Sequence, residues 1–146
     1  ASSDPVIAPI DENGIVLGNT SGRVKVTATS EDGGHVASCT VYIVSLGDMM
    51  NVYFPTASLI INSGYYTGTM SCAIKNNSSQ TVKLTRFYVY SNETNSTPIN
   101  MTDLGDLKSG ETITLQFNLS HVYEPAFIWV FECNGSKYNT WNKFKE

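Results

Sequence analysis

The feature that most constrains the fold is an alternation of apolar and polar residues in short stretches separated by Gly- and Asn-rich turns. The clearest alternation lies in Thr112–Leu119, whose apolar members are Ile113, Leu115, Phe117 and Leu119. A period of two places such side chains on one face of a β-strand. About seven short stretches of this kind are typical of an antiparallel β-sandwich, and no segment demands a helix. The sequence therefore predicts an all-β fold.

One stretch, Val82–Tyr90, breaks the alternation. Val82 and Leu84 share one parity, whereas Phe87 and Val89 share the other. An extra residue near Thr85-Arg86 would bring all four apolar side chains to one face, so we predict a β-bulge there. The alternative is a strand that is buried on both faces.

The first third of the chain predicts a run of turns and hairpins. Two short strands flank the turn Asp11–Gly14, in which Asn-Gly supplies the positive φ of a tight turn. A hairpin follows, with strands at residues 24–28 and 37–44 around the turn Glu31–Gly34. The alternation predicts an inward face made of Ala37, Cys39, Val41 and Ile43.

This order of turns and strands, from Ser2-Ser3-Asp4-Pro5 to the closing strand with its single Cys39, resembles the second half of a group-2 bacterial immunoglobulin-like (Big2) domain. The resemblance covers residues 2–44 and implies an Ig-like, extracellular or cell-surface module of a bacterial protein rather than an enzyme. It also implies that Cys39 faces the core and that the front strands of the domain are absent. We expect the open face to be covered by the second unit, by strand-mediated homodimerisation, or by sequence outside this chain.

The domain organisation predicted from these patterns has three parts. Residues 1–44 form the Ig-like half-domain, residues 45–48 a short linker, and residues 49–146 a second antiparallel β-sandwich.

Composition excludes several functions. Nine Lys and Arg residues and a formal net charge of −4 provide no electrostatic surface for nucleic acid. No apolar run approaches the roughly 20 residues of a membrane-spanning helix, so we expect no membrane-spanning segment in this chain. The N-terminus has no basic-apolar leader, and we expect any signal peptide to have been removed or to lie outside this chain.

Catalytic and metal-binding patterns are weak. The only imidazoles, His35 and His121, fall in different predicted domains, and the acidic residues fall mainly in turns. Of the three cysteines, Cys72 and Cys133 form one disulfide if their strands face each other; otherwise all three are buried thiols. No Cys/His spacing predicts a metal site. We expect no catalytic residue, no cofactor and no metal.

Aromatic residues are the better functional signal, because exposed rings pack against the C–H faces of sugars. Trp129 lies in an apolar run and is predicted to be core. Tyr65, Tyr66, Tyr138 and Trp141 flank Gly or polar residues and are the candidate ligand-binding residues, although structural aromatic residues of a sandwich would show the same pattern.

Three functions follow from these patterns, and none is catalytic. The first is a structural spacer or adhesion unit at the cell surface, whose partner is a surface protein or a glycan. The alternatives are a carbohydrate-binding module and an accessory domain of a secreted hydrolase.

Overall fold

A computed structural model describes residues 1–145 and divides the chain into two compact units, Ala1–Ser45 (unit 1) and Leu46–Glu146 (unit 2). The regular structure of the described residues is β, apart from the 3₁₀ turn η1 (Leu46–Met49). The predicted all-β, Ig-like class with antiparallel sheets is confirmed. None of the helical structure in residues 1–145 has the length or apolar character needed to cross a membrane.

Unit 1 is built on the predicted hairpin. Strands β1 (Gly22–Thr29) and β2 (Val36–Ile43) pair antiparallel, with Val26 opposite Cys39. The turn at Asp11 is also present, because the Asp11 carboxylate accepts hydrogen bonds from the backbone N–H groups of Asn13 and Ile15 at 2.9 and 2.8 Å. The two strands predicted around this turn are reduced to one bridge between Ile10 and Val16.

The predicted inward face of β2 is wrong in its first half. Ala37 and Cys39 are exposed, whereas Val41 and Ile43 are half-buried. Periodicity places side chains on a shared face, but burial also requires a second layer over that face. Within the described residues of unit 1 the sheet has two strands only, and Cys39 has no such layer over it.

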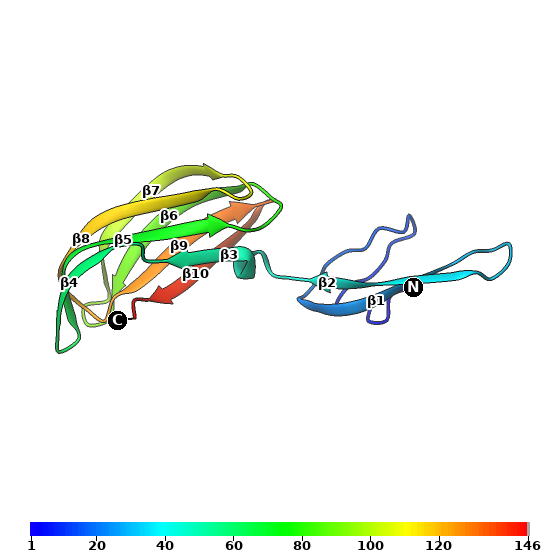
Figure 1. Ribbon diagram of the computed structural model, residues 1–146, viewed down its shortest axis with the longest axis horizontal. Coiled ribbons are helices and arrows are strands. Elements are labelled where there is room, and N and C mark those ends of the chain that lie inside the picture. The colour runs from blue at the N-terminus through cyan, green and yellow to red at the C-terminus, as the bar shows by residue number, and fades with distance from the viewer. Residues whose placement is uncertain (146) are drawn as a thin grey trace. The chain divides into compact units, whose positions relative to one another are not determined.

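Unit 2 is a sandwich of two antiparallel sheets, drawn as two layers in Figure 1. Its strands are β3 (Met50–Tyr53), β4 (Ala57–Asn62), β5 (Tyr65–Asn76), β6 (Val82–Ser91), β7 (Ser96–Leu107), β8 (Thr112–Tyr123), β9 (Ala126–Cys133) and β10 (Ser136–Lys143). One sheet has the strand order β10-β9-β6-β7. In the other sheet β5 pairs with β3 and β4 along one edge and with β8 along the opposite edge.

The predicted β-bulge in β6 is confirmed. The register of β6 shifts between Leu84 and Arg86 against both of its neighbours, β7 and β9. As a result Val82, Leu84, Phe87 and Val89 are all at most 1% exposed. The bulge therefore brings the apolar side chains before and after it onto the same inner face of the sheet. It leaves Tyr88 and Tyr90 on the outer face.

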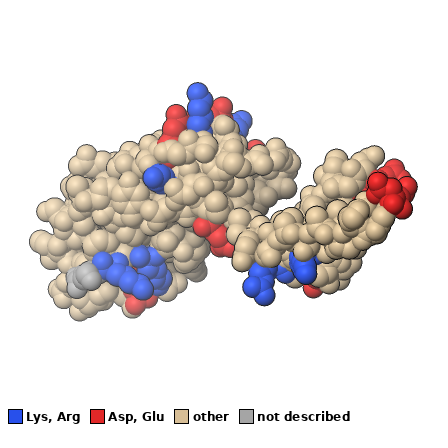
Figure 2. All heavy atoms as spheres, turned by 45° about the vertical axis from the view of Figure 1, so that its right-hand side comes forward, with Lys and Arg blue, Asp and Glu red and all other residues tan. Residues whose placement is uncertain are grey.

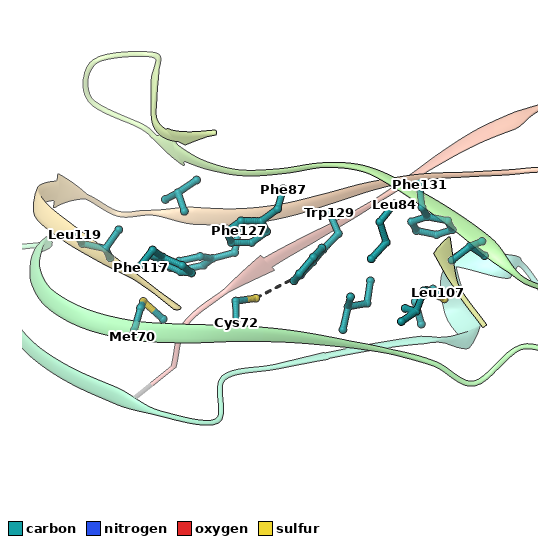
Figure 3. Close-up of a cluster of buried hydrophobic side chains, with 14 of the residues drawn as sticks. Met70, Cys72, Leu84, Phe87, Leu107, Phe117, Leu119, Phe127, Trp129 and Phe131 are labelled. Atoms are coloured by element: carbon teal, nitrogen blue, oxygen red, sulfur yellow. Dashed lines mark hydrogen bonds between the residues drawn. The ribbon is translucent and has the colours of Figure 1, made fainter. Parts of the chain in front are cut away.

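Trp129 lies at the centre of the core, as predicted, and is fully buried. Figure 3 shows its indole directed toward Cys72 of β5, with Phe87 and Phe127 beside it; the indole Nε1–H donates to the Cys72 sulfur at 3.4 Å. The ring of Phe87 lies 4.6 Å from Trp129, centroid to centroid. Cys72 and Cys133 are buried free thiols, so the disulfide alternative is wrong.

Candidate functional site

The outer face of sheet β10-β9-β6-β7 carries a cluster of large side chains. Trp141 of β10 lies opposite Ile128 of β9, and Ile128 lies opposite Tyr88 of β6, so the three form one cross-strand row. Tyr90, two residues along β6, shares their face. We call Trp141, Tyr90, Tyr88 and Arg86 the aromatic face.

The geometry of the aromatic face combines rings with polar groups. The Tyr90 and Trp141 rings lie 5.9 Å apart with an interplanar angle of 52°. The Arg86 guanidinium carbon lies 3.9 Å from the Tyr88 ring centroid, and Arg86 Nε donates to Asn100 Oδ1 at 2.6 Å. A cation over a ring in this position is stabilised by the ring quadrupole, and the hydrogen bond fixes its orientation.

Exposure separates Trp141 from the other aromatic residues of this face. Trp141 is 59% exposed, whereas Ile128 beside it is fully buried although it lies on the outer face. Neighbouring side chains on the face therefore cover Ile128, and Trp141 provides much of the accessible apolar surface. Trp141 and Tyr90 offer ring surface for C–H groups, and the guanidinium of Arg86 and the amide of Asn100 lie beside Tyr88 on the same sheet.

A second aromatic cluster lies at the β6–β7 turn. The Tyr65 hydroxyl donates to Glu93 Oε2 at 2.5 Å, and the Tyr65 ring stacks on the His121 ring with centroids 4.0 Å apart and planes 6° from parallel. The hydrogen bond to Glu93 raises the pKa of the Tyr65 phenol, with further contributions from desolvation and from the Glu93 charge. Two residues further along the turn, Asn95 accepts a hydrogen bond from the Tyr90 hydroxyl.

The surface beside Tyr65 and His121 is hollowed. One cavity of about 290 Å³ is lined by Tyr65, Ser91, Glu93, Thr94, Ser96, Pro98, Ser120, His121 and Val122, and we call it the Tyr65 hollow. A second cavity of about 380 Å³ shares Tyr65 and His121 and continues to Ile60, Asn62, Ser63 and Thr67. The stacked ring pair therefore forms part of the wall of both cavities.

The backbone around His121 holds this wall in place. The register between β5 and β8 shifts between Tyr66 and Gly68, and His121 adopts a φ of 53°, in the left-handed region. The His121 N–H donates to the Thr67 hydroxyl at 3.1 Å. An irregularity of this kind re-aims a side chain out of the regular alternation of a strand.

The four predicted ligand-binding residues do not form one site. Trp141 lies on the aromatic face, and Tyr65 lines the Tyr65 hollow. Tyr66 and Tyr138 are half-buried and pack against the core, where Tyr138 stacks on Phe131 at 5.5 Å.

Sequence reasoning missed Tyr88, Tyr90, Glu93 and His121 as members of these surfaces. A usable signal existed for the first two, because the predicted bulge in β6 turns Tyr88 and Tyr90 outward. Glu93 and His121 had no comparable signal, since their proximity to Tyr65 depends on long-range strand pairing.

The side chains that could ligate a metal are dispersed over the described part of the chain. Among residues 1–145, no three His, Cys, Asp or Glu side chains gather in a way that could hold a metal ion. His35 belongs to unit 1 and His121 to unit 2. On the face shown in Figure 2, basic and acidic side chains form small groups separated by uncharged surface.

The described residues form an all-β, Ig-like module with an exposed tryptophan, Trp141, on one sheet. Residues 1–41 match the family model described as Bacterial Ig-like domain (group 2), which confirms the partial resemblance predicted from the sequence. A comparison with curated proteins gave no match. Domains of this family are typical of extracellular or surface proteins of bacteria and are generally non-catalytic. The match therefore indicates a surface or structural module of a bacterial protein.

Proposed function

We propose that the chain is a non-catalytic binding module of a bacterial cell-surface or secreted protein, and that unit 2 binds a carbohydrate through the aromatic face. The observation that carries this proposal is the 59% exposure of Trp141 beside Tyr90, on the edge strand of a sandwich with a complete core. Folding does not require this exposure, because Trp129 and its neighbours already fill the core.

The chemistry of the aromatic face suits a sugar. A ring face packs against the C–H groups of a pyranose, while hydroxyl groups of the sugar need donors and acceptors close to the ring. Arg86 and Asn100 supply such groups beside the Tyr88 ring, on the second and third strands from Trp141 in the same sheet. Tyr and Trp also contribute large contact areas at a low cost in conformational entropy, which favours them at binding surfaces.

In this proposal unit 1 is the structural part and unit 2 the binding part. The proposed domains are residues 1–44 and 49–146 with a linker at 45–48. The division of the structure into residues 1–45 and 46–146 supports them, as does a core cluster that lies wholly within unit 2. A role as an accessory domain beside a hydrolase would use the same aromatic face.

A glycan-array screen of the intact chain tests the proposal. We expect a hit whose binding is weakened about twofold to twelvefold by Trp141→Ala, taking for the ring contact the about 0.5–1.5 kcal/mol of a pair of aromatic rings. The matched control is Tyr53→Ala, which removes a 40% exposed ring from β3 in the other sheet. Equal binding by Trp141→Ala and the unmodified chain would contradict the assignment. A blank array would leave the spacer or protein-adhesion role.

A further inference from the structure

The Tyr65 hollow is separate from the aromatic face, and none of its lining residues belongs to that face. We infer that this hollow is a second carbohydrate site, which takes a single neutral or amino sugar residue. The inference shares with the proposed function only the class of ligand, because it concerns other residues and a differently shaped surface.

The size of the hollow limits its ligand. Its volume of about 290 Å³ lies at the lower end of the roughly 300–1,000 Å³ typical of small-molecule sites. A site of this size accommodates one sugar ring rather than an extended oligosaccharide. The aromatic face, in contrast, is an open surface on a sheet and sets no such limit.

The lining of the hollow is rich in groups that complement sugar hydroxyls. Four aliphatic hydroxyls line it, from Ser91, Thr94, Ser96 and Ser120. A hydroxyl can donate and accept hydrogen bonds, as a sugar hydroxyl does, and those of Thr94 and Ser96 are hydrogen-bonded to each other. The Glu93 carboxylate accepts one hydrogen bond from Tyr65 and keeps acceptor capacity for others, since an ionised carboxylate offers about four lone-pair sites.

The two rings that line the hollow, those of Tyr65 and His121, are fixed by contacts within the protein. Tyr65 is fixed at its hydroxyl by Glu93 and along its face by His121, and His121 is fixed at its backbone by Thr67. The left-handed φ of His121 is a local strain of the kind that surrounding structure must maintain. Preorganisation of this kind lowers the cost of ordering side chains on binding.

The charge of the hollow selects among sugars. Glu93 is the only ionisable carboxyl group among the lining residues, which contain no Lys or Arg. A uronate would place a second carboxylate beside Glu93, and like charges at close range are unfavourable. A neutral sugar avoids this repulsion, and the ammonium group of a hexosamine would be attracted to Glu93.

An NMR titration of the ¹⁵N-labelled full chain tests the inference with glucose, glucosamine and glucuronate as probes. We expect glucose or glucosamine to shift the amide signals of residues 93–96 and 120–122 and the ring signals of His121, with His35 as an internal reference. Glucuronate is expected to cause much smaller shifts. The Trp141 indole signal reports the aromatic face separately, so the failure of either site is distinguishable from the failure of the other.

Two variants sharpen the test. Glu93→Gln removes the charge in an exposed turn and is expected to weaken binding at the hollow about tenfold or more, because hydrogen bonds to a charged group are the strong ones. Tyr65→Phe keeps the ring stack but removes the hydroxyl that orients Glu93, and we expect a smaller loss. Glu31→Gln is the control, since it makes the same charge change at an exposed turn of unit 1.

Three results would overturn the inference. The first is that no probe shifts residues 93–96 or His121. The second is that glucuronate binds as well as glucose and glucosamine. The third is that Glu93→Gln and Glu31→Gln have the same effect. Shifts confined to the Trp141 indole would support the aromatic face and would also refute the hollow.

Discussion

Replacement of Trp129 by alanine is expected to be the most damaging single change in unit 2. Trp129 is fully buried between Phe87 and Cys72, and its indole N–H is directed to the Cys72 sulfur. Truncation of a buried Trp or Phe to Ala costs about 3–5 kcal/mol, since it removes buried apolar area and leaves a cavity. For a unit of 101 residues, from 46 to 146, each kcal/mol lowers Tm by roughly 4–8 °C. We therefore expect a loss of at least about 12 °C.

Urea and thermal unfolding of the full chain measure this loss, with Trp141→Ala as the matched control. Both tryptophans lie in unit 2, so each variant keeps one indole as a fluorescence probe of that unit. Trp141 is 59% exposed, and its removal is expected to change the free energy of unfolding by less than about 1 kcal/mol. If Trp129→Ala cost less than about 2 kcal/mol, or no more than Trp141→Ala, the central position of Trp129 in the core would be refuted.

Thiol reactivity and backbone strain provide two further predictions. Burial raises the pKa of the Cys72 thiol to about 12, against an opposing hydrogen bond from Trp129. Iodoacetamide at pH 8 should therefore modify the exposed Cys39 and leave Cys72 unmodified until urea is added. Equal labelling of the two thiols in the native state would contradict this. Because the folded protein keeps the Cys72 thiol neutral up to about pH 12 while the unfolded chain ionises it from about pH 9, the free energy of unfolding is expected to fall as the pH rises from 9 to 12. Unfolding measured at pH 8 and at pH 10.5 tests this fall. Gly68→Ala should lower the free energy of unfolding by at least about 2 kcal/mol, because Gly68 has a φ of 138° and a Cβ there would lie 2.1 Å from the Ser58 carbonyl oxygen. Gly110→Ala, with a φ of 81° and open space around it, is the control, and an equal cost at both positions would show that the close approach at Gly68 is unimportant.

Local sequence patterns were enough to predict the inner faces of β6 and β8. In β6, four apolar residues of two parities can share one core only if the strand contains a bulge, which is why the sequence predicted one. The register shift lies at the predicted position. The neighbouring strand β7 (Ser96–Leu107) was missed. It is an edge strand with a largely exposed, polar sequence that contains Pro98 and Gly105, so it lacks the alternation that identifies a half-buried strand.

Burial and site assembly depend on partners that local patterns do not reveal. The alternation of β2 was read correctly as a strand, but burial of Cys39 would require a second layer that unit 1 does not form in the described residues. Tyr65 and Trp141 were identified from their neighbours in the sequence. Glu93 and His121 join Tyr65 only through the pairing of β5 with β8 and the turn after β6, and such long-range contacts leave no local signature.

The exposed apolar residues of unit 1 follow from its architecture, whereas those of unit 2 lie outside a filled core. Of the nine large hydrophobic residues that are exposed among residues 1–145, six belong to unit 1: Val6, Ile15, Leu17, Val36, Tyr42 and Val44. A two-stranded sheet has too little surface to bury its own apolar side chains, so exposure there follows from the architecture of unit 1. Unit 2 has two sheets and a filled core, and its described residues still expose Tyr53, Ile60 and Trp141. Exposure alone therefore does not separate Trp141 from Tyr53 and Ile60. The Tyr90 ring, 5.9 Å from that of Trp141, does, and this pair of rings is the basis of the proposed binding role.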